Sequence, residues 1–422
     1  MKSLERELKK LSYDKVNHSP AENSGYMHGL PFHSFVSWII NSCKSLGIKK
    51  VYYCTREGEF FKQIHDKILS SSPMCPSEQP ESELLEVSRM STFLPSLSDC
   101  NREEFSRLWR QYDNQTIDEF CASLNLPVEE VQGFLATYSL SISDYINSDD
   151  SRVDLLWQDI NFKAWLKSYV VTSKNFLLSY LKQKQITAET NSFAMVDIGW
   201  RGTIQDNIAY ILPQTQIFGY YFGLIPALNP QPSNVNKHGY FNRFTSYKVI
   251  LKSPTPIEFL ANSNNGSVIN YHLTNNCVSS NRQSDKVESE IFLKFILPFQ
   301  SGVLDFVSDF NSSKIKNNFD DSCIDSVSYK VMYRLMCNPP KEASSYFFMY
   351  PHNEIFGMAK TVTHNFKMPR FFLLHILFKR NGLKKLRKFL NSTRWPQAYL
   401  KVHNLSLLLP IYNFILKFEN KI

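Results

Sequence analysis

The sequence lacks the features that mark several large classes of protein. Its eight cysteines are scattered, with no Cys-x-x-Cys pair and no histidine-rich cluster beside them. This spacing argues against a zinc site and a disulfide scaffold, and we expect reduced thiols in a cytoplasmic protein. The charged start, MKSLERELKKL, has no apolar core of a signal peptide. Near the end, the apolar run from Phe371 to Phe378 contains His375 and is too short to span a bilayer.

The chain does have the length and composition of a large globular protein. It has 422 residues, of which 43% are hydrophobic and 20% are charged. The net charge of +8 is uneven, because residues 366–422 hold 12 lysines and arginines and one acid. That segment carries +11, which leaves −3 for everything before it. We expect more than one structural unit, the last of them strongly basic.

Residues 193–212, FAMVDIGWRGTIQDNIAYIL, predict a strand, a glycine-bounded loop and a helix. The glycines let the backbone approach a ligand, and free N–H groups at a helix start attract an anion. Arg201 can fork onto phosphate oxygens, and Asp197 stands at the carboxyl end of the strand, where open α/β sheets bind ligands. We expect a phosphorylated ligand here, held by Gly199, Trp200, Arg201, Gly202 and Thr203. An ordinary strand-to-helix turn with a solvated arginine is the alternative.

A second segment repeats this pattern. Residues 49–54 predict a strand, the loop Thr55-Arg56-Glu57-Gly58 follows, and apolar residues at helical spacing come next. A helix over residues 32–46 precedes the strand, and a third strand over 84–87 ends in Ser88-Arg89. This alternation favours an α/β fold with a mostly parallel, doubly wound sheet. Arg56, Arg89 and Arg201 at three strand ends, with two acids, predict a polyanion site; each arginine alone is more typical of a surface charge.

The remaining organisation follows from composition. We expect a polar lead over residues 1–25 and an α/β catalytic domain over 26–275, with a helical insertion at 101–186. Ile217 to Ile225 predicts an aromatic strand beside the Asp197 loop. Residues 276–286 are polar and predict a flexible loop, and a helical region follows over 287–422, with a polar break near 311–321.

The basic tail, residues 366–422, predicts an amphipathic helical segment. Its basic residues alternate with apolar ones from Phe371 to Trp395. Such a helix can lie on an anionic membrane surface, or it can pack on the core with its basic face in water. Nucleic acid is the third possible partner, and the absence of a recognisable nucleic-acid module argues against it. The first of these readings places the protein peripherally at the inner face of the cytoplasmic membrane.

Four segments together resemble a known family. They are GYMHGLPFHSFVSWIINSCKSLGIKKVYYCTREGEFF, LEVSRMSTFLPSL, VDIGWRGTIQDNI and GYYFGLI. As a set, over residues 25–356, they resemble the C-terminal domain of bacterial surface-polysaccharide proteins often labelled haloacid-dehalogenase-like. The resemblance implies a phosphoribosyltransferase-like fold and a glycosyltransferase of capsule or O-antigen assembly. Such an enzyme transfers 5-phosphoribosyl from phosphoribosyl pyrophosphate (PRPP) to a hydroxyl of a growing glycan, and a fused phosphatase then leaves ribofuranose.

The resemblance also implies roles for particular residues. The loop of Thr55, Arg56, Glu57 and Gly58 would face the pyrophosphate, beside the strand end Ser88-Arg89. The loop from Val196 through Gln205 would cradle the 5-phosphate, with Asp197 near the ribose hydroxyls. Ordinary phosphoribosyltransferases carry two adjacent acids there, whereas this chain has Ile198 in the second place. Glu258 matches a recurring family acid or is only a charge at a helix start. Either Asp197 or Glu57 would act as the base.

The resemblance leaves some features open. The chain has no Asp-x-Asp-x-Thr/Val phosphatase motif in a strand context, so a separate phosphatase would remove the 5-phosphate, or it stays. Mg²⁺ would arrive with the pyrophosphate donor, with no ligand set of its own on the protein. The acceptor would be a lipid-linked glycan. A sugar-nucleotide-dependent glycosyltransferase and a non-catalytic subunit of a polysaccharide assembly complex are the alternative functions.

Overall fold

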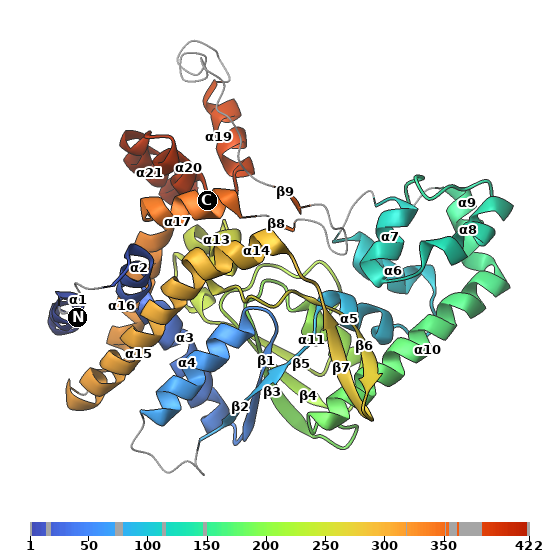
Figure 1. Ribbon diagram of the computed structural model, residues 1–422, viewed down its shortest axis with the longest axis horizontal. Coiled ribbons are helices and arrows are strands. Elements are labelled where there is room, and N and C mark those ends of the chain that lie inside the picture. Colours follow the sequence, from blue (N-terminus) through green and yellow to red (C-terminus); the bar gives the residue numbers. More distant parts are fainter. Residues whose placement is uncertain are drawn as a thin grey trace.

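A five-stranded, all-parallel sheet lies at the centre of the computed structural model (Figure 1). The structure describes residues 2–13, 18–71, 79–111, 115–146, 150–317, 319–350, 352–353, 361–362 and 382–419. The strand order is β2-β1-β3-β4-β5. The strands are β1 (Lys50–Cys54), β2 (Glu81–Leu85), β3 (Ser192–Asp197), β4 (Gln216–Tyr221) and β5 (Val235–Gly239). The predicted α/β fold with a parallel sheet is thereby confirmed.

Both faces of the sheet are buried, as parallel sheets require. Alternate side chains of a strand point to opposite faces, so Val51 and Tyr53 enter one core while Tyr52 and Cys54 enter another. The first face packs with α3 (Gly29–Ser45) and α4 (Gly58–Ser70), and α15 (Leu297–Asn317) packs on both helices. The second face packs with α10 (Ile160–Gln183), α11 (Thr203–Ile211) and an antiparallel hairpin of β6 (Val268–Thr274) and β7 (Cys277–Arg282). The result is three layers.

Between β2 and β3 the chain forms a separate helical lobe, at the right of Figure 1. It comprises α5 (Arg89–Phe93), α6 (Arg102–Trp109), α7 (Ile117–Leu124), α8 (Val128–Thr137), α9 (Ser151–Gln158) and the first half of α10. The lobe has its own aromatic core, in which Phe105, Phe120 and Trp157 are in contact. Thr116 and Glu119 form a capping box at the start of α7.

The N-terminal residues differ from the polar lead predicted over 1–25. They form α1 (Lys2–Tyr13) and α2 (Pro20–Met27), and α2 packs on α15. Tyr26 contacts the Phe306 ring edge-to-face at 5.6 Å between centroids and donates a hydrogen bond to Asp309. The contact face of α2 consists of the small residues Ala21, Ser24 and Gly25, which carry little apolar signal in a sequence.

Four further predictions need correction. Residues 276–286 do not form a loop, because Cys277–Arg282 is β7, whose backbone pairs with β6 although its side chains are mostly polar. The predicted third strand, 84–87, lies at Glu81–Leu85, and the aromatic strand ends at Tyr221 rather than at Ile225. The polar break near 311–321 is shorter than predicted, since α15 continues to Asn317 and Asp320 caps the next helix.

The C-terminal region is helical in the parts that the structure describes. Its helices are α12 (Tyr247–Leu251), α13 (Thr255–Ala261), α14 (Lys286–Ile291), a π-helical turn η4 (Phe292–Ile296), α16 (Asp321–Cys337), α17 (Lys341–Met349), α19 (Gly382–Ser392), α20 (Pro396–Val402) and α21 (Leu409–Glu419); a short pair of strands, β8 (His352–Asn353) and β9 (Thr361–Val362), follows α17. Among the described residues, the helical stretch 286–314 is long and apolar enough to cross a bilayer. Half of its most apolar window is buried, and Val303 and Val307 lie in the core, as in a core helix.

The basic tail is oriented differently from a membrane-embedded amphipathic helix. Residues 366–381 and 420–422 lie outside the described residues. In α19 the exposed side chains are basic, whereas Leu390 and the following Trp395 are buried in the main core. The Trp395 indole donates a hydrogen bond to the carbonyl of Met336 at 3.0 Å. Over residues 384–395, therefore, apolar side chains pack on the core and the basic side chains of α19 are exposed.

Candidate functional site

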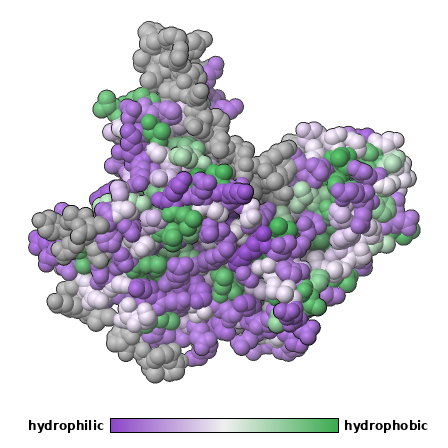
Figure 2. Space-filling model, viewed as in Figure 1, coloured by the Kyte–Doolittle hydropathy of each residue, from purple (hydrophilic) through white to green (hydrophobic). Residues whose placement is uncertain are grey.

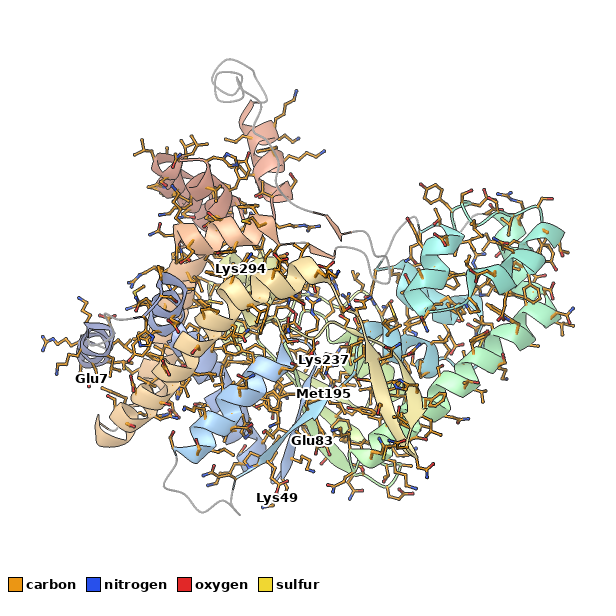
Figure 3. All side chains as sticks on the ribbon, in the orientation of Figure 1. Glu7, Lys49, Glu83, Met195, Lys237 and Lys294 are labelled. Carbon is orange, nitrogen blue, oxygen red and sulfur yellow. The ribbon has the colours of Figure 1, made fainter. Side chains whose placement is uncertain are left out.

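The strand order creates a crevice at the carboxyl edge of the sheet. After β1 the chain crosses to β2 on one side, and it returns to β3 on the other side of β1. The loops after β1 and β3 therefore diverge, and this is where open α/β sheets bind ligands. In Figure 3, Lys49 at the amino end of β1 lies at the lower edge, so the carboxyl ends face the middle of the molecule. A cavity of about 440 Å³ lies there, lined by the loops after β1, β2 and β3.

The loop after β1 presents charged side chains. Thr55 fixes it, because its hydroxyl donates to the carbonyl of Val87 and its N–H donates to that of Leu85, both at 3.1 Å. Arg56 lies 4.0 Å from a carboxylate oxygen of Glu57 and 3.8 Å from one of Glu288. The loop thus holds a half-buried arginine between acids.

The loop after β3 presents backbone. Gly199 has φ +138° and Gly202 has φ +70°, conformations that residues with a side chain rarely adopt. A Cβ on Gly199 would lie 2.3 Å from the carbonyl oxygen of Gly223, so the loop packs tightly on the segment after β4. The Lys237 ammonium, visible near the middle of Figure 3, donates to the carbonyl of Arg201 at 2.9 Å and pairs with Asp206. Each of these two loops also contains a cis peptide bond, at Thr55–Arg56 and Gly199–Trp200.

The two candidate bases differ in their electrostatics. Burial raises the pKa of Asp197 to about 8, and the neighbouring charge of Glu57 raises it further than the Arg89 guanidinium lowers it. The Asp197 carboxylate accepts a hydrogen bond from the N–H of Ile198 at 2.8 Å. Burial also raises the pKa of Glu57, against the opposing charge of Arg56. Near neutral pH, Asp197 of the ligand-free protein is therefore mostly protonated.

Arginines from four segments line the cavity within the described part of the chain. They are Arg56, Arg89, Arg201 and Arg394. Burial alone would lower the pKa of Arg56, but the Tyr350 hydroxyl and the nearby carboxylates raise it on balance, so this guanidinium stays charged. Set against Glu57, Asp197 and Glu258, the arginines leave a positive excess that suits a ligand with several phosphate oxygens.

The wall opposite the sheet comes from the C-terminal half of the chain. Glu258 of α13 accepts a hydrogen bond from the indole N–H of Trp200 at 2.7 Å. It therefore ties the β3 loop to α13 and also lines the cavity, beyond the role of a helix-start charge. Tyr350, at the end of α17, completes this wall together with Thr255 and residues of the hairpin.

Most residues predicted for the site line this one cavity. They are Thr55, Arg56, Glu57, Ser88, Arg89, Asp197, Gly199, Trp200, Arg201, Gly202, Thr203 and Glu258. The Ser88 hydroxyl is already engaged, since it donates to the carbonyl of Val268 and caps α5. Its side chain therefore shapes the wall, and its hydrogen bonds go to protein.

Two predicted donor-binding residues, Gly58 and Gln205, do not line the cavity. Gly58 begins α4, where a Cβ would lie 2.9 Å from the backbone of Tyr53, so it serves helix–strand packing. Gln205 is fully buried behind the β3 loop. Its amide donates to the carbonyls of Ile217 and Asn236, and its oxygen accepts from Tyr221 at 2.6 Å. Gln205 joins α11 to the sheet, and its hydrogen-bonding groups are thereby engaged.

Three residues that line the cavity were not predicted from the sequence: Arg394, Tyr350 and Gln111. Gln111 follows α6, and Arg394 lies between α19 and α20 with φ +62°. The one local signal was that Arg394 precedes Trp395 and Pro396, an aromatic anchor and a helix start. The surrounding lysines and arginines made it look like part of the basic tail instead.

The carboxylates of the cavity do not form a metal cage. Within the part of the chain that the structure describes, no group of three His, Cys, Asp or Glu side chains could hold a metal ion. A cation here would depend on oxygens of the ligand, with Asp197 and Glu57 facing it. These two carboxylates fit a cation that arrives on a polyphosphate. The negative charge of Glu57 opposes ionisation of Asp197, and an added positive charge would offset that repulsion.

Comparisons with known proteins add no family to these observations. No protein-family model matches the chain, and no curated protein matches it.

Proposed function

We propose that this chain is a glycosyltransferase that transfers 5-phosphoribosyl from PRPP to a hydroxyl of a bacterial surface glycan, with release of pyrophosphate. One observation carries the proposal. Arginines from four separate segments and three carboxylates converge on one cavity, at the point where the loops after β1 and β3 diverge. A ligand with two phosphate-bearing ends and a central ring matches that distribution of charge and backbone.

The two loops divide the donor between them in this proposal. Arg56 and Arg89 bind the pyrophosphate, since guanidinium groups pair bidentately with phosphate oxygens. The β3 loop binds the 5-phosphate through backbone N–H groups and the start of α11, with Arg201 and Thr203 beside it. Contacts at both ends hold the ribose so that C1 is open to attack on the face opposite the pyrophosphate.

The transfer exchanges one C–O bond for another. The bond from C1 to the pyrophosphate oxygen breaks, and its electron pair leaves with the pyrophosphate. The acceptor hydroxyl oxygen forms the new bond to C1 with inversion, and its proton passes to a carboxylate. Positive charge develops on the ring meanwhile, and the fixed charges of Arg56 and Arg89 stabilise the departing pyrophosphate.

Asp197 is the base that the electrostatics favour. A base works best when its pKa lies near the operating pH, and the pKa of Asp197 is about 8. Asp197 is the last residue of β3. Its carboxylate lies between the loop assigned to the 5-phosphate and the loop assigned to the pyrophosphate. Glu57, which lies against Arg56, contributes through its charge instead.

Magnesium is the cofactor that this reaction implies, because PRPP carries it on its pyrophosphate oxygens. Asp197 and Glu57 are the side chains that would face it, as their donor chemistry fits. When bound, it supplies neutralisation of negative charge on the leaving group. The protein residues position the donor and accept the proton.

The cellular setting extends the proposal to its partners. A lipid-linked glycan at the inner face of the cytoplasmic membrane would be the acceptor. The sequence carries no phosphatase motif of the dehalogenase type in a strand context. In this proposal a separate phosphatase removes the 5-phosphate, or it stays on the glycan.

A thermal-shift panel in the presence of Mg²⁺ tests the donor. The ligands are PRPP, ribose 5-phosphate, pyrophosphate and several sugar nucleotides. A ligand at a hundred times its dissociation constant stabilises by about 2.7 kcal/mol, which raises Tm by several degrees. We expect PRPP to stabilise the protein, and Arg201→Ala to reduce that shift.

The other outcomes decide between the remaining functions. Stabilisation by a sugar nucleotide and not by PRPP would assign the chain to the sugar-nucleotide-dependent glycosyltransferases. No shift with any donor, together with no pyrophosphate release in the presence of membranes that contain acceptor, would favour a non-catalytic assembly subunit.

A further inference from the structure

The short turn η5 (Ser406–Leu408) and the C-terminal helix α21 that follows it expose three large apolar side chains on one side. Leu407 is 91% exposed, Ile411 59% and Phe414 61%. Their spacing of four and then three residues places them on one side of a helical path. In Figure 2, hydrophobic side chains gather over the end of the molecule where Figure 1 places α21. The three residues form the apolar face discussed below.

The opposite side of α21 is firmly attached to the protein. Tyr412 and Leu416 are buried in the main core. The Tyr412 hydroxyl donates to the Asn391 side chain of α19 at 3.0 Å, and the Asn413 amide donates to the carbonyl of Cys337 at 2.9 Å. The apolar face is therefore held outward by the fold.

The C-terminal segment that carries the apolar face is positively charged. The neighbouring helix α19 exposes Lys384, Lys385, Arg387 and Lys388. From residue 382 to residue 418 the sequence has no aspartate or glutamate. Apolar side chains flanked by basic ones match an anionic lipid surface, in which the apolar groups enter the headgroup–acyl boundary and the cations contact headgroups.

Exposed apolar residues elsewhere have a different setting. Ile160 at the start of α10 is 81% exposed, but it follows Asp159, and Asp154 lies in the preceding helix. Those carboxylates would be repelled by an anionic surface. The absence of carboxylates from residue 382 to residue 418 therefore separates α19–α21 from the start of α10.

We propose that the docking surface of the protein, formed by the apolar face of α21 and the basic face of α19, binds an anionic lipid bilayer. The sequence-based expectation placed the basic segment on an anionic membrane surface, and the proposal adds the apolar face as the part that enters it. The unit that docks also carries Arg394, which lines the cavity, so the membrane and the donor site share one structural element. The inference rests on the proposed function for the location of the acceptor.

Vesicle co-sedimentation of the full-length chain tests the proposal. Vesicles of phosphatidylcholine alone are compared with vesicles that also contain phosphatidylglycerol. One variant replaces the apolar face: Leu407→Ser, Ile411→Ser and Phe414→Ser. A matched control replaces exposed apolar residues of the helical lobe: Leu155→Ser, Ile160→Ser and Val171→Ser.

A second pair of variants tests the charge. The basic face becomes neutral with Lys384→Gln, Lys385→Gln, Arg387→Gln and Lys388→Gln. Its control neutralises four exposed lysines elsewhere: Lys49→Gln, Lys67→Gln, Lys167→Gln and Lys182→Gln.

We expect the unmodified chain to bind the anionic vesicles and both docking variants to bind about tenfold more weakly, with both controls unchanged. Equal binding by the apolar variant and the unmodified chain would overturn the proposal, as would an equal loss in the controls. A dimer that only the apolar variant dissociates, without vesicle binding, would assign the face to a second copy of the chain. Vesicle binding requires no donor, so its failure while PRPP still binds would overturn this inference alone.

Discussion

The loops after β1 and β3 line the same cavity but present different chemical groups to it. The first offers charged side chains, with Arg56 held between Glu57 and Glu288. The second offers backbone, with two glycines at positive φ packed against the segment after β4. Side-chain charge suits a leaving group whose charge changes during reaction, whereas fixed N–H groups suit a phosphate that stays unchanged. In the proposed function, this contrast lets two strand ends of similar sequence pattern bind opposite ends of one ligand.

The largest expected effect separates the carboxylates of the two loops. Asp197→Asn should reduce turnover at least about tenfold, because an amide cannot accept the acceptor proton. Glu57→Gln should reduce turnover less, since its charge and not its basicity is used. The rate of pyrophosphate release at saturating PRPP measures both. Equal rates for Asp197→Asn and the unmodified protein would remove Asp197 as the base.

A glycine series compares how tightly the two loops are packed. Gly199→Ala should lower stability by about 3 kcal/mol, because φ is +138° and the new Cβ meets the Gly223 carbonyl at 2.3 Å. Gly58→Ala should cost less, since the closest atom lies at 2.9 Å and α4 can shift. Gly133→Ala is the control, because it lies in α8 with no atom within 4 Å and should stabilise slightly. Tm reports all three, and a Gly199→Ala protein as stable as the control would contradict this packing.

The pH dependence of stability tests the electrostatics of Asp197. Its pKa is raised from 3.8 in the unfolded chain to about 8 in the folded protein, so the folded state binds the proton more tightly. The contribution of the raised Asp197 pKa to the free energy of unfolding is fully present below pH 3.8, and it is lost as pH rises through about 8. The ligand-free protein should therefore lose stability over this range, on the order of a few kcal/mol, relative to Asp197→Asn. Parallel pH profiles of Tm for the two proteins would show that Asp197 is ionised throughout.

The smallest expected effect concerns the arginine that comes from outside both loops. Arg394→Ala should raise the KM for PRPP several-fold with little change in kcat, because one of four guanidinium groups is lost from the cavity. Lys401→Ala, in the next helix, is the control and should leave both constants unchanged. A KM unaffected by Arg394→Ala would remove the C-terminal unit from the donor site.

Local sequence was enough to predict the parts of the site that are local in the chain. The segments around Thr55–Glu57 and Asp197–Thr203 each combine a strand, a loop and a helix, so periodicity and glycine placed them correctly at strand ends. Tyr350 and Arg394 reach the cavity from helices far along the chain, and no local pattern reports such a contact. The prediction for Gln205 was wrong although the residue lies within the motif. Its side chain faces the sheet, and its place in the motif does not reveal this.

The wrong predictions about the fold also concern contacts that the local sequence pattern does not report. The hairpin strand Cys277–Arg282 is stabilised by backbone pairing with β6, which polar side chains do not reveal. Helix α2 packs through small residues that hydropathy does not register. Sheet strands that are buried on both faces, such as Lys50–Cys54, were predicted well because burial requires a continuous apolar run.

The most direct test of the account is a calorimetric titration of the two ends of the donor, in Mg²⁺, against Arg56→Ala and Arg201→Ala. The account predicts a crossed pattern: Arg56→Ala loses affinity for pyrophosphate and keeps it for ribose 5-phosphate, whereas Arg201→Ala does the reverse. If each variant weakened both ligands equally, or if neither ligand bound the unmodified protein, the division of the donor between the two loops would be wrong.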